Sequence, residues 1–241
     1  MKSEKFKREL NMIVNSDVRE FAKTALDNLP DYFFEVAASS TGKYHPSYAL
    51  GEGGLVRHTC AAVRFANHLF QLEQFQNQFS ERDRDLVITA ILLHDGWKHG
   101  DKGSKFTTFE HPQVAADWVR NSECIETYLP LEDRETIAKA IESHMGQWNV
   151  SNKSKTILKK PENKIQKFVH MCDYLASRKD IEVLFDDYSV PEIPDINTYV
   201  LNFGKHNGKT LPEIAEVDPS YISWAKENMR KEPIKSLLKL L

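Results

Sequence analysis

Apolar residues recur every three or four positions through most of the first 189 residues. Phe6, Leu10 and Ile13 show this spacing, and so do Val18 and Phe21. The period is typical of helices that bury one face. Further helices are expected from Leu55 to about Phe75, from Arg84 to His94, from His111 onward, from Leu131 to Met145 and from Pro161 to Ala176.

One of these segments has no polar face to expose. The residues from Leu86 to Leu93 are almost wholly apolar. A helix that is apolar all round must be buried on every side. The pattern therefore predicts a central helix, with His94 and Asp95 at its end.

The pattern changes near Tyr188, where prolines and acidic residues indicate a linker. Beyond it, Tyr199 to Phe203 is a strand candidate, and Asn207-Gly208 is a strong hairpin-turn signal. Three short helices are expected after the turn, over Leu211–Glu216, Asp218–Met229 and Pro233–Leu241. We predict an all-α bundle over residues 1–189 and a small α+β appendage over residues 190–241.

Composition narrows the functional classes. The 241 residues carry a formal net charge of −3, so no global basic field indicates a tight binder of long nucleic acids. The three cysteines stand apart in no CxxC pattern, which favours a reducing compartment over a disulfide scaffold. The charged start and the lack of a long apolar run predict a cytoplasmic protein that makes no membrane contact.

Histidine and aspartate residues stand out on five of the expected helices. They are His58, His94-Asp95, His111, His144 and Asp173. Imidazole and carboxylate are ligands of borderline and harder divalent cations. Each residue taken alone has a structural alternative, such as a helix cap for His111 or an ion pair with Arg178 or Lys179 for Asp173.

The ordered series resembles the HD superfamily of metal-dependent phosphohydrolases over roughly residues 15–185. The matching segments are Gly-Gly-Leu-Val-Arg-His-Thr, Leu-Leu-His-Asp, Glu-His-Pro, Glu-Ser-His and Cys-Asp-Tyr-Leu-Ala. The resemblance implies that His58, His94, Asp95 and Asp173 hold one metal. It also implies a second metal with His111 and His144, with Asp95 between the two. Manganese is the first expectation, with iron, nickel, cobalt, zinc or magnesium as alternatives.

Within the superfamily, the stretch from Val18 to Thr59 looks most like bacterial 3′→5′ exoribonucleases. In that setting His45, within Lys43-Tyr44-His45-Pro46, is expected to contact metal or phosphate, or else to pack its loop. The chain departs from this branch in two places. The turn after His-Asp reads Gly96-Trp97-Lys98, and no strand-rich OB module precedes the helices.

Several residues near the series are candidates for binding the substrate. Lys98 is expected to reach a phosphate oxygen as a point charge, with a solvated lysine as the alternative. Asp173 is expected to act as ligand, general base or both. Arg57 and Lys105 are further candidates for phosphate contact, with a solvated surface position as the alternative. Four aromatic residues lie near the expected site: Tyr44, Tyr48, Trp97 and Trp148. One or two of them are expected to stack on a base, and packing in the core is the alternative for each.

The segment from about Asn197 to Asn228 resembles the small C-terminal module of exonuclease X-type proteins. The resemblance implies an accessory role near nucleic acid, with charge from Lys205 and Lys209 and stacking from Tyr221 and Trp224. The alternative is that the two aromatic rings form the module's own core, and we expect this for Trp224.

These features predict a phosphodiesterase, with 3′→5′ exonuclease action on short single strands as the leading hypothesis. A nucleotide phosphohydrolase, either a 5′-nucleotidase or a dNTP triphosphohydrolase, is the alternative. A non-catalytic nucleotide-sensing adaptor is a third hypothesis. The sequence leaves the oligomeric state open.

Overall fold

Helix α5 (Glu81–Leu93) is the buried element around which the larger part of the chain is built. It begins at a capping box, in which Ser80 and Asp83 satisfy each other's backbone N–H groups. Every residue from Asp85 to Leu93 is buried. The helix packs against α2 (Ser16–Asp27), α3 (Gly54–Leu69), α7 (Leu131–Glu142) and α8 (Lys164–Ala176). The predicted central helix is confirmed.

The structure is a computed structural model that describes residues 1–39, 45–101, 103–185, 194–229 and 233–241. The chain divides into two compact units, Met1–Tyr188 and Ser189–Leu241. None of the helices in the described ranges is long and apolar enough to cross a bilayer.

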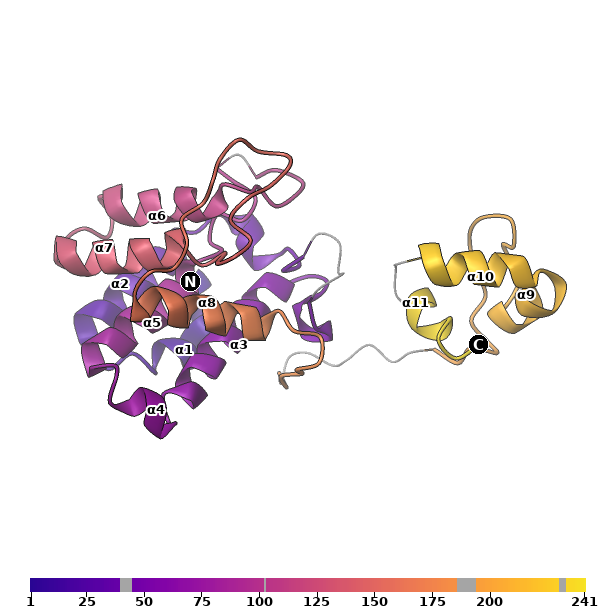
Figure 1. The fold of residues 1–241 in the computed structure, drawn as a ribbon, viewed down its shortest axis with the longest axis horizontal. Helices are drawn as coiled ribbons and strands as arrows, with labels where there is room; N and C mark the ends of the chain where they lie inside the picture. The colour runs from indigo at the N-terminus through magenta and orange to yellow at the C-terminus, as the bar shows by residue number, and fades with distance from the viewer. Residues whose placement is uncertain (40–44, 102, 186–193, 230–232) are drawn as a thin grey trace. The chain divides into compact units, whose positions relative to one another are not determined.

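The larger unit is a helical bundle, as the sequence predicts. Figure 1 shows α6 and α7 side by side, with α8 in front of α5 in that view. Besides α5, the helices are η1 (Lys2–Phe6), α1 (Lys7–Leu10), α2 (Ser16–Asp27), η2 (Asp31–Phe34), η3 (Ser47–Ala49), α3 (Gly54–Leu69), α4 (Glu73–Gln76), α6 (His111–Asn121), α7 (Leu131–Glu142) and α8 (Lys164–Ala176).

Two helices end earlier than the periodicity predicts. The helix expected to continue to Phe75 stops at Leu69, and the buried Phe70 ring that follows stacks on Phe168 at 4.6 Å between ring centroids. Helix α7 ends at Glu142 rather than near Met145. There the Ser143 hydroxyl donates to the Lys139 carbonyl, and the chain leaves the helix just before His144.

A buried carboxylate ties the N-terminal segment to the central helix. Asp85 is 1% exposed and accepts hydrogen bonds from the backbone N–H groups of Val14 and Asn15, at 2.9 and 2.8 Å. Asn15 in turn caps α2 through its side-chain oxygen. One carboxylate of α5 therefore fixes where α2 begins.

The described part of the smaller unit has its own apolar core and three helices, α9 (Leu211–Val217), α10 (Pro219–Asn228) and α11 (Ile234–Leu237). The strand expected over Tyr199–Phe203 is reduced to an isolated bridge between Val200 and Thr210. Thr210 caps α9 in a capping box with Glu213, so the chain turns into a helix instead of extending the pair. The all-α fold class is confirmed.

The hydrogen bonds of Asp85 lead to a prediction about the stability of the fold. Replacement by alanine leaves two backbone N–H groups without their acceptor, so we expect Asp85→Ala to lower the free energy of unfolding by about 1–3 kcal/mol. Urea denaturation measures this loss. The exposed Glu126→Ala serves as the control and should change stability by less than about 0.5 kcal/mol. Equal stabilities of the two variants would contradict the role of Asp85.

Candidate metal centre

The six residues of the His/Asp series lie at or near the ends of helices that meet at the C-terminal end of α5. His94 caps the C-terminus of α5 and Asp95 follows it. His58 lies in the second turn of α3, and His111 is the first residue of α6. The two others are His144, just after α7, and Asp173, near the end of α8.

Two glycines set the start of α3 and so the position of His58. Gly53 has a φ of +67°, a left-handed conformation that favours glycine. A Cβ on Gly54 would lie 2.4 Å from the carbonyl oxygen of Ala49. The Gly-Gly pair therefore lets the helix approach the preceding loop closely, which explains this part of the motif.

Asp95 lies at the centre of the cluster, and its two oxygens face different histidines. Oδ1 is 3.0 Å from His111 Nε2 and 3.8 Å from His144 Nε2. Oδ2 is 3.4 Å from His94 Nε2 and 4.0 Å from His58 Nε2.

Asp173 closes the side of the cluster that contains His58 and His94. Its Oδ1 lies 3.0 Å from His58 Nε2 and 3.5 Å from His94 Nε2. All six side chains thus converge.

Three of the histidines are oriented by the same hydrogen bond. The Nδ1 atoms of His94, His111 and His144 lie 2.6–2.7 Å from the carbonyl oxygen three residues earlier in the chain. A ring that donates from Nδ1 to a carbonyl keeps the lone pair of Nε2 free, and such bonds are the usual support of metal-binding histidines. In each ring Nε2 points toward Asp95.

The cluster contains buried polar atoms that the protein does not satisfy. His94 Nε2 and Asp95 Oδ1 are buried and make no well-aligned hydrogen bond within the described residues, although His111 Nε2 lies 3.0 Å from Oδ1. Buried polar atoms without a partner cost free energy unless something else binds them. Three groups within the cluster bring their ligand atoms within 4.8 Å of one another: His58 with His94 and Asp95, His94 with His144 and Asp173, and Asp95 with His111 and His144. This donor set fits divalent metal ions.

The charges of the cluster suit cation binding. Burial raises the pKa of Asp95, but the charges of Lys98 and His94 beside it hold this pKa well below the usual range. Burial likewise raises the pKa of Asp173, but its contacts with His58 and His94 hold that pKa well below the usual range too. Both carboxylates are therefore ionised near neutral pH. Burial, followed by the charges of His94 and His111, lowers the pKa of His144 to about 3, so this ring is neutral.

Lys98 extends into the same site. Its side chain is 11% exposed and its ammonium group contacts Asp95 Oδ2. This contact is i,i+3 within the turn that follows α5. A positive charge is thus held beside the carboxylate at the centre of the cluster.

A cavity of about 710 Å³ opens over the cluster. Its size lies within the range of about 300–1,000 Å³ that is usual for small-molecule sites. Its lining combines three kinds of side chain: the floor residues Asp95, His111, His144 and Asp173, the cations Lys98, Lys153 and Arg178, and the aromatic residues Phe106, Trp148 and Tyr174.

The remaining predicted substrate residues lie in different surroundings. His45 lines the cavity, with its ring 5.1 Å from that of His58, and burial lowers its pKa to about 3. Arg57 does not line it: its guanidinium donates to three backbone carbonyls between Tyr48 and Glu52. Lys105 is exposed, with its ammonium 5.7 Å from the centre of the Phe106 ring, and it does not line the cavity either.

The aromatic candidates separate into core and cavity residues. Tyr48 is fully buried and donates its hydroxyl to the Ala176 carbonyl, and Trp97 packs on Trp118 in the core. Tyr44 and Lys43 lie outside the described residues. Among the aromatic candidates that the structure describes, Trp148 is therefore the one that lines the cavity.

Sequence reasoning missed three of the residues that line the cavity, Tyr174, Arg178 and Lys153. Tyr174 directly follows Asp173, and that adjacency is the signal that could have identified it. The sequence suggests Arg178 only as an ion-pair partner for Asp173. In the structure its guanidinium lies 4.1 Å from the centre of the Tyr174 ring.

In the smaller unit, Asp218 organises the residues that the sequence singles out. It accepts from Lys205 at 2.9 Å and lies 3.1 Å from His206 Nε2, and the His206 ring packs on Tyr221. The expectation that Trp224 forms the core of this unit is wrong, because Trp224 is 51% exposed. Aliphatic residues such as Leu211 and Ile214 fill the core instead.

Comparison with known proteins gives two family matches. Residues 201–230 match the exodeoxyribonuclease X-like C-terminal family. No curated protein and no solved structure matches the chain. Residues 55–178, more than half of the chain, match the HD domain, and this range includes all six residues of the buried cluster. The chain therefore belongs to the HD domain family of metal-dependent phosphohydrolases.

Proposed function

We propose that the six clustered residues hold two divalent metal ions, and that the protein is a phosphodiesterase that removes nucleotides from the 3′ end of short single strands. The observation that carries this proposal is the convergence of His58, His94, Asp95, His111, His144 and Asp173 below an open cavity. His58, His94, Asp95 and Asp173 would hold one ion. His111 and His144, with Asp95 between the two sites, would hold the other.

A pair of divalent ions, when bound, supplies Lewis-acid stabilisation of a phosphoryl group and lowers the pKa of water. The residues of this chain prepare the site for that chemistry. Three Nδ1 bonds to backbone carbonyls hold the rings of His94, His111 and His144 in place, and burial keeps His144 neutral. The Lys98 ammonium lines the cavity and would neutralise a non-bridging phosphate oxygen. Asp173 is ionised and half-buried at the cavity floor, and its lowered pKa suits a metal ligand better than a proton acceptor.

Several observations favour the end of a short strand as substrate. The net charge of −3 gives no long-range attraction for long nucleic acids. The cations that line the cavity, Lys98, Lys153 and Arg178, are local to it. The match to the exodeoxyribonuclease X-like C-terminal family supports nucleic acid over a free nucleotide. The resemblance of Val18 to Thr59 to bacterial exoribonucleases supports the 3′→5′ direction.

The site does not favour the adaptor hypothesis. An adaptor that had lost catalysis would be expected to have its ligand side chains apart, whereas here all six converge. The nucleotide phosphohydrolase remains the alternative that the first experiment separates from the exonuclease.

The first prediction concerns the bond that is cut. With Mn²⁺ present, we expect the purified protein to shorten 5′-end-labelled single-stranded RNA or DNA from its 3′ end. Asp95→Asn should lose at least about 1,000-fold in rate, because several kcal/mol of transition-state stabilisation depend on the metal site. Circular dichroism should show unchanged helical content in this variant. Release of inorganic phosphate from mononucleotides, with oligomers left intact, would instead indicate the nucleotide phosphohydrolase.

The second prediction concerns Lys98. Its loss removes a charge-assisted contact to phosphate, so we expect Lys98→Met to lower kcat/KM by about 10- to 100-fold. Metal content, measured by mass spectrometry, should not fall, because the ammonium is not a ligand. Lys167→Met, on the exposed face of α8, is the control and should retain its activity. A Lys98 variant with normal kcat/KM would show that this lysine only neutralises Asp95.

The third prediction concerns protons. Burial lowers the pKa of His94, but Asp95 and Asp173 raise it to about 10, so the metal-free protein holds a proton there at pH 7 to 8.5. A bound metal must displace this proton. Affinity for Mn²⁺ should therefore rise with pH, by about tenfold per unit for one proton released.

Calorimetric titration of the metal-free protein at pH 7 and 8.5 measures this dependence. His94→Gln should bind Mn²⁺ more weakly and with a flatter pH dependence, because it has no proton to release. Affinity of the wild type that did not change with pH would exclude His94 as a protonated ligand.

A further inference from the structure

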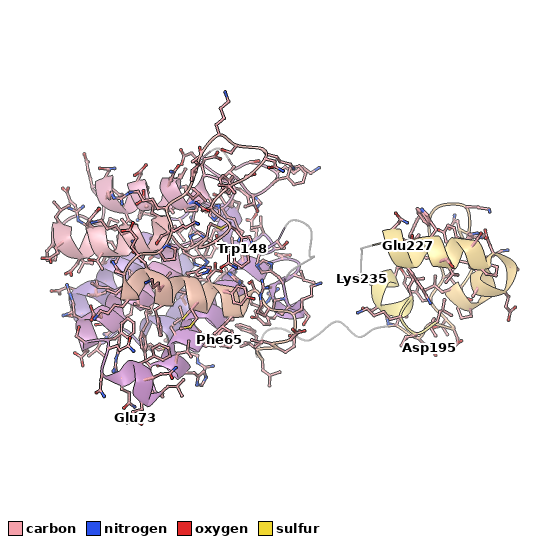
Figure 2. All side chains as sticks on the ribbon, viewed as in Figure 1. Phe65, Glu73, Trp148, Asp195, Glu227 and Lys235 are labelled. Atoms are coloured by element: carbon pink, nitrogen blue, oxygen red, sulfur yellow. The ribbon has the colours of Figure 1, made fainter. Side chains whose placement is uncertain are left out.

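Three side chains form a stacked array at the mouth of the cavity. The rings of Trp148 and Tyr174 are nearly parallel, with centroids 5.7 Å apart and an interplanar angle of 11°. The Arg178 guanidinium lies 4.1 Å from the centre of the Tyr174 ring. All three residues line the cavity. Trp148, labelled in Figure 2 on the segment between α7 and α8, keeps 45% of its surface exposed.

The array is tied closely to the residues of the cavity floor. Tyr174 directly follows Asp173, and Trp148 is four residues after His144. His170 links the two sides, because its Nδ1 lies 2.7 Å from the His144 carbonyl oxygen and its ring is 6.0 Å from that of Trp148. A group held at the floor would therefore have an aromatic surface beside it.

A glycine allows this arrangement. Gly146 lies between His144 and Trp148 with a φ of +58°, and a Cβ there would lie 2.2 Å from the His170 ring. Any other residue would displace His170 and the turn that carries Trp148. The position of the tryptophan is thus fixed by backbone geometry and by a hydrogen bond to a floor residue's carbonyl.

Exposed aromatic rings beside cations are the usual means of binding a nucleobase without reading its identity. Trp148 offers an exposed ring, Tyr174 and His170 restrain that ring, and Arg178 and Lys153 supply charge for a phosphodiester backbone. Trp148 thus keeps its ring accessible, whereas Trp97 in the core is 5% exposed.

From this geometry we infer that Trp148, supported by Tyr174 and Arg178, is a nucleobase subsite that stacks the base of the nucleotide whose phosphate lies at the cavity floor. The inference rests on the proposed function, since it takes the phosphate to lie at the cluster. It adds that the substrate is recognised through one base, with little preference among the four bases. Trp148 is thus a binding residue, and His170 is a positioning residue.

Two non-cleavable ligands that differ only in the base test this subsite. One is the 5′-methylenephosphonate analogue of adenosine monophosphate, and the other is the same sugar phosphonate without adenine. Calorimetry with Mn²⁺ present should show that the full-length wild type binds the first about 5- to 100-fold more tightly. Trp148→Ala should remove most of this ratio by weakening only the ligand that carries the base, and Trp148→Phe should restore part of it.

Tyr128→Ala, which removes a 38%-exposed aromatic residue that does not line the cavity, is the matched control and should keep the full ratio. Thermal melting and manganese content verify that each variant is folded and holds metal. Equal binding of the two ligands by the wild type, or no binding of either, would overturn the subsite. An equal loss for both ligands in Trp148→Ala would overturn it as well, because it would assign Trp148 to the shape of the floor.

The proposed function fails in a different way. A base-dependent binding ratio without cleavage of any phosphoester would keep the subsite and reject the phosphodiesterase. Cleavage of oligomers without a base-dependent ratio would reject the subsite alone.

Discussion

The buried carboxylate of Asp95 is the feature on which the larger unit of this protein depends. It is 2% exposed, yet it is charged, and burial of a charge is costly unless partners compensate for it. Its oxygens lie within 4 Å of the Lys98 ammonium and of four histidine rings, those of His58, His94, His111 and His144. The buried helix α5 thus ends at the charged cluster around Asp95. The fold must bring four further helix ends to that point, and this requirement explains why the site lies inside the bundle.

Helix termini serve the site better than helix centres would. At the ends of α5 and α7, and at the start of α6, the carbonyl three residues back accepts a bond from the histidine ring. Carbonyls at such positions are not all used within the helix. The backbone therefore orients the rings without further side chains. The turn after α7 extends this arrangement outward, because Gly146 and His170 place Trp148 above the residues that the helix ends position.

The smaller unit follows a different design. Its core is aliphatic, while Lys205, His206 and Tyr221 gather around Asp218 at its surface and Trp224 is left exposed. This unit is the part of the chain that matches the exodeoxyribonuclease X-like C-terminal family. That residues 190–241 are an accessory module to a phosphohydrolase domain over residues 1–189 is a prediction of the sequence.

Periodicity predicted the helical class and the buried central helix, because both depend on local spacing. The six residues that converge came from an ordered series of motifs that resembles the HD superfamily. The tertiary structure decided which neighbours of the motif reach the cavity. Arg57 adjoins His58 in sequence but binds loop carbonyls, whereas Tyr174 and Arg178, on a helix, form one stack with Trp148, on a loop. It also decided that Phe70, just beyond α3, packs on Phe168 of α8. Sequence spacing specifies which face of one helix a residue occupies, but the contact between two elements depends on how both pack, and a single chain pattern does not encode that distance.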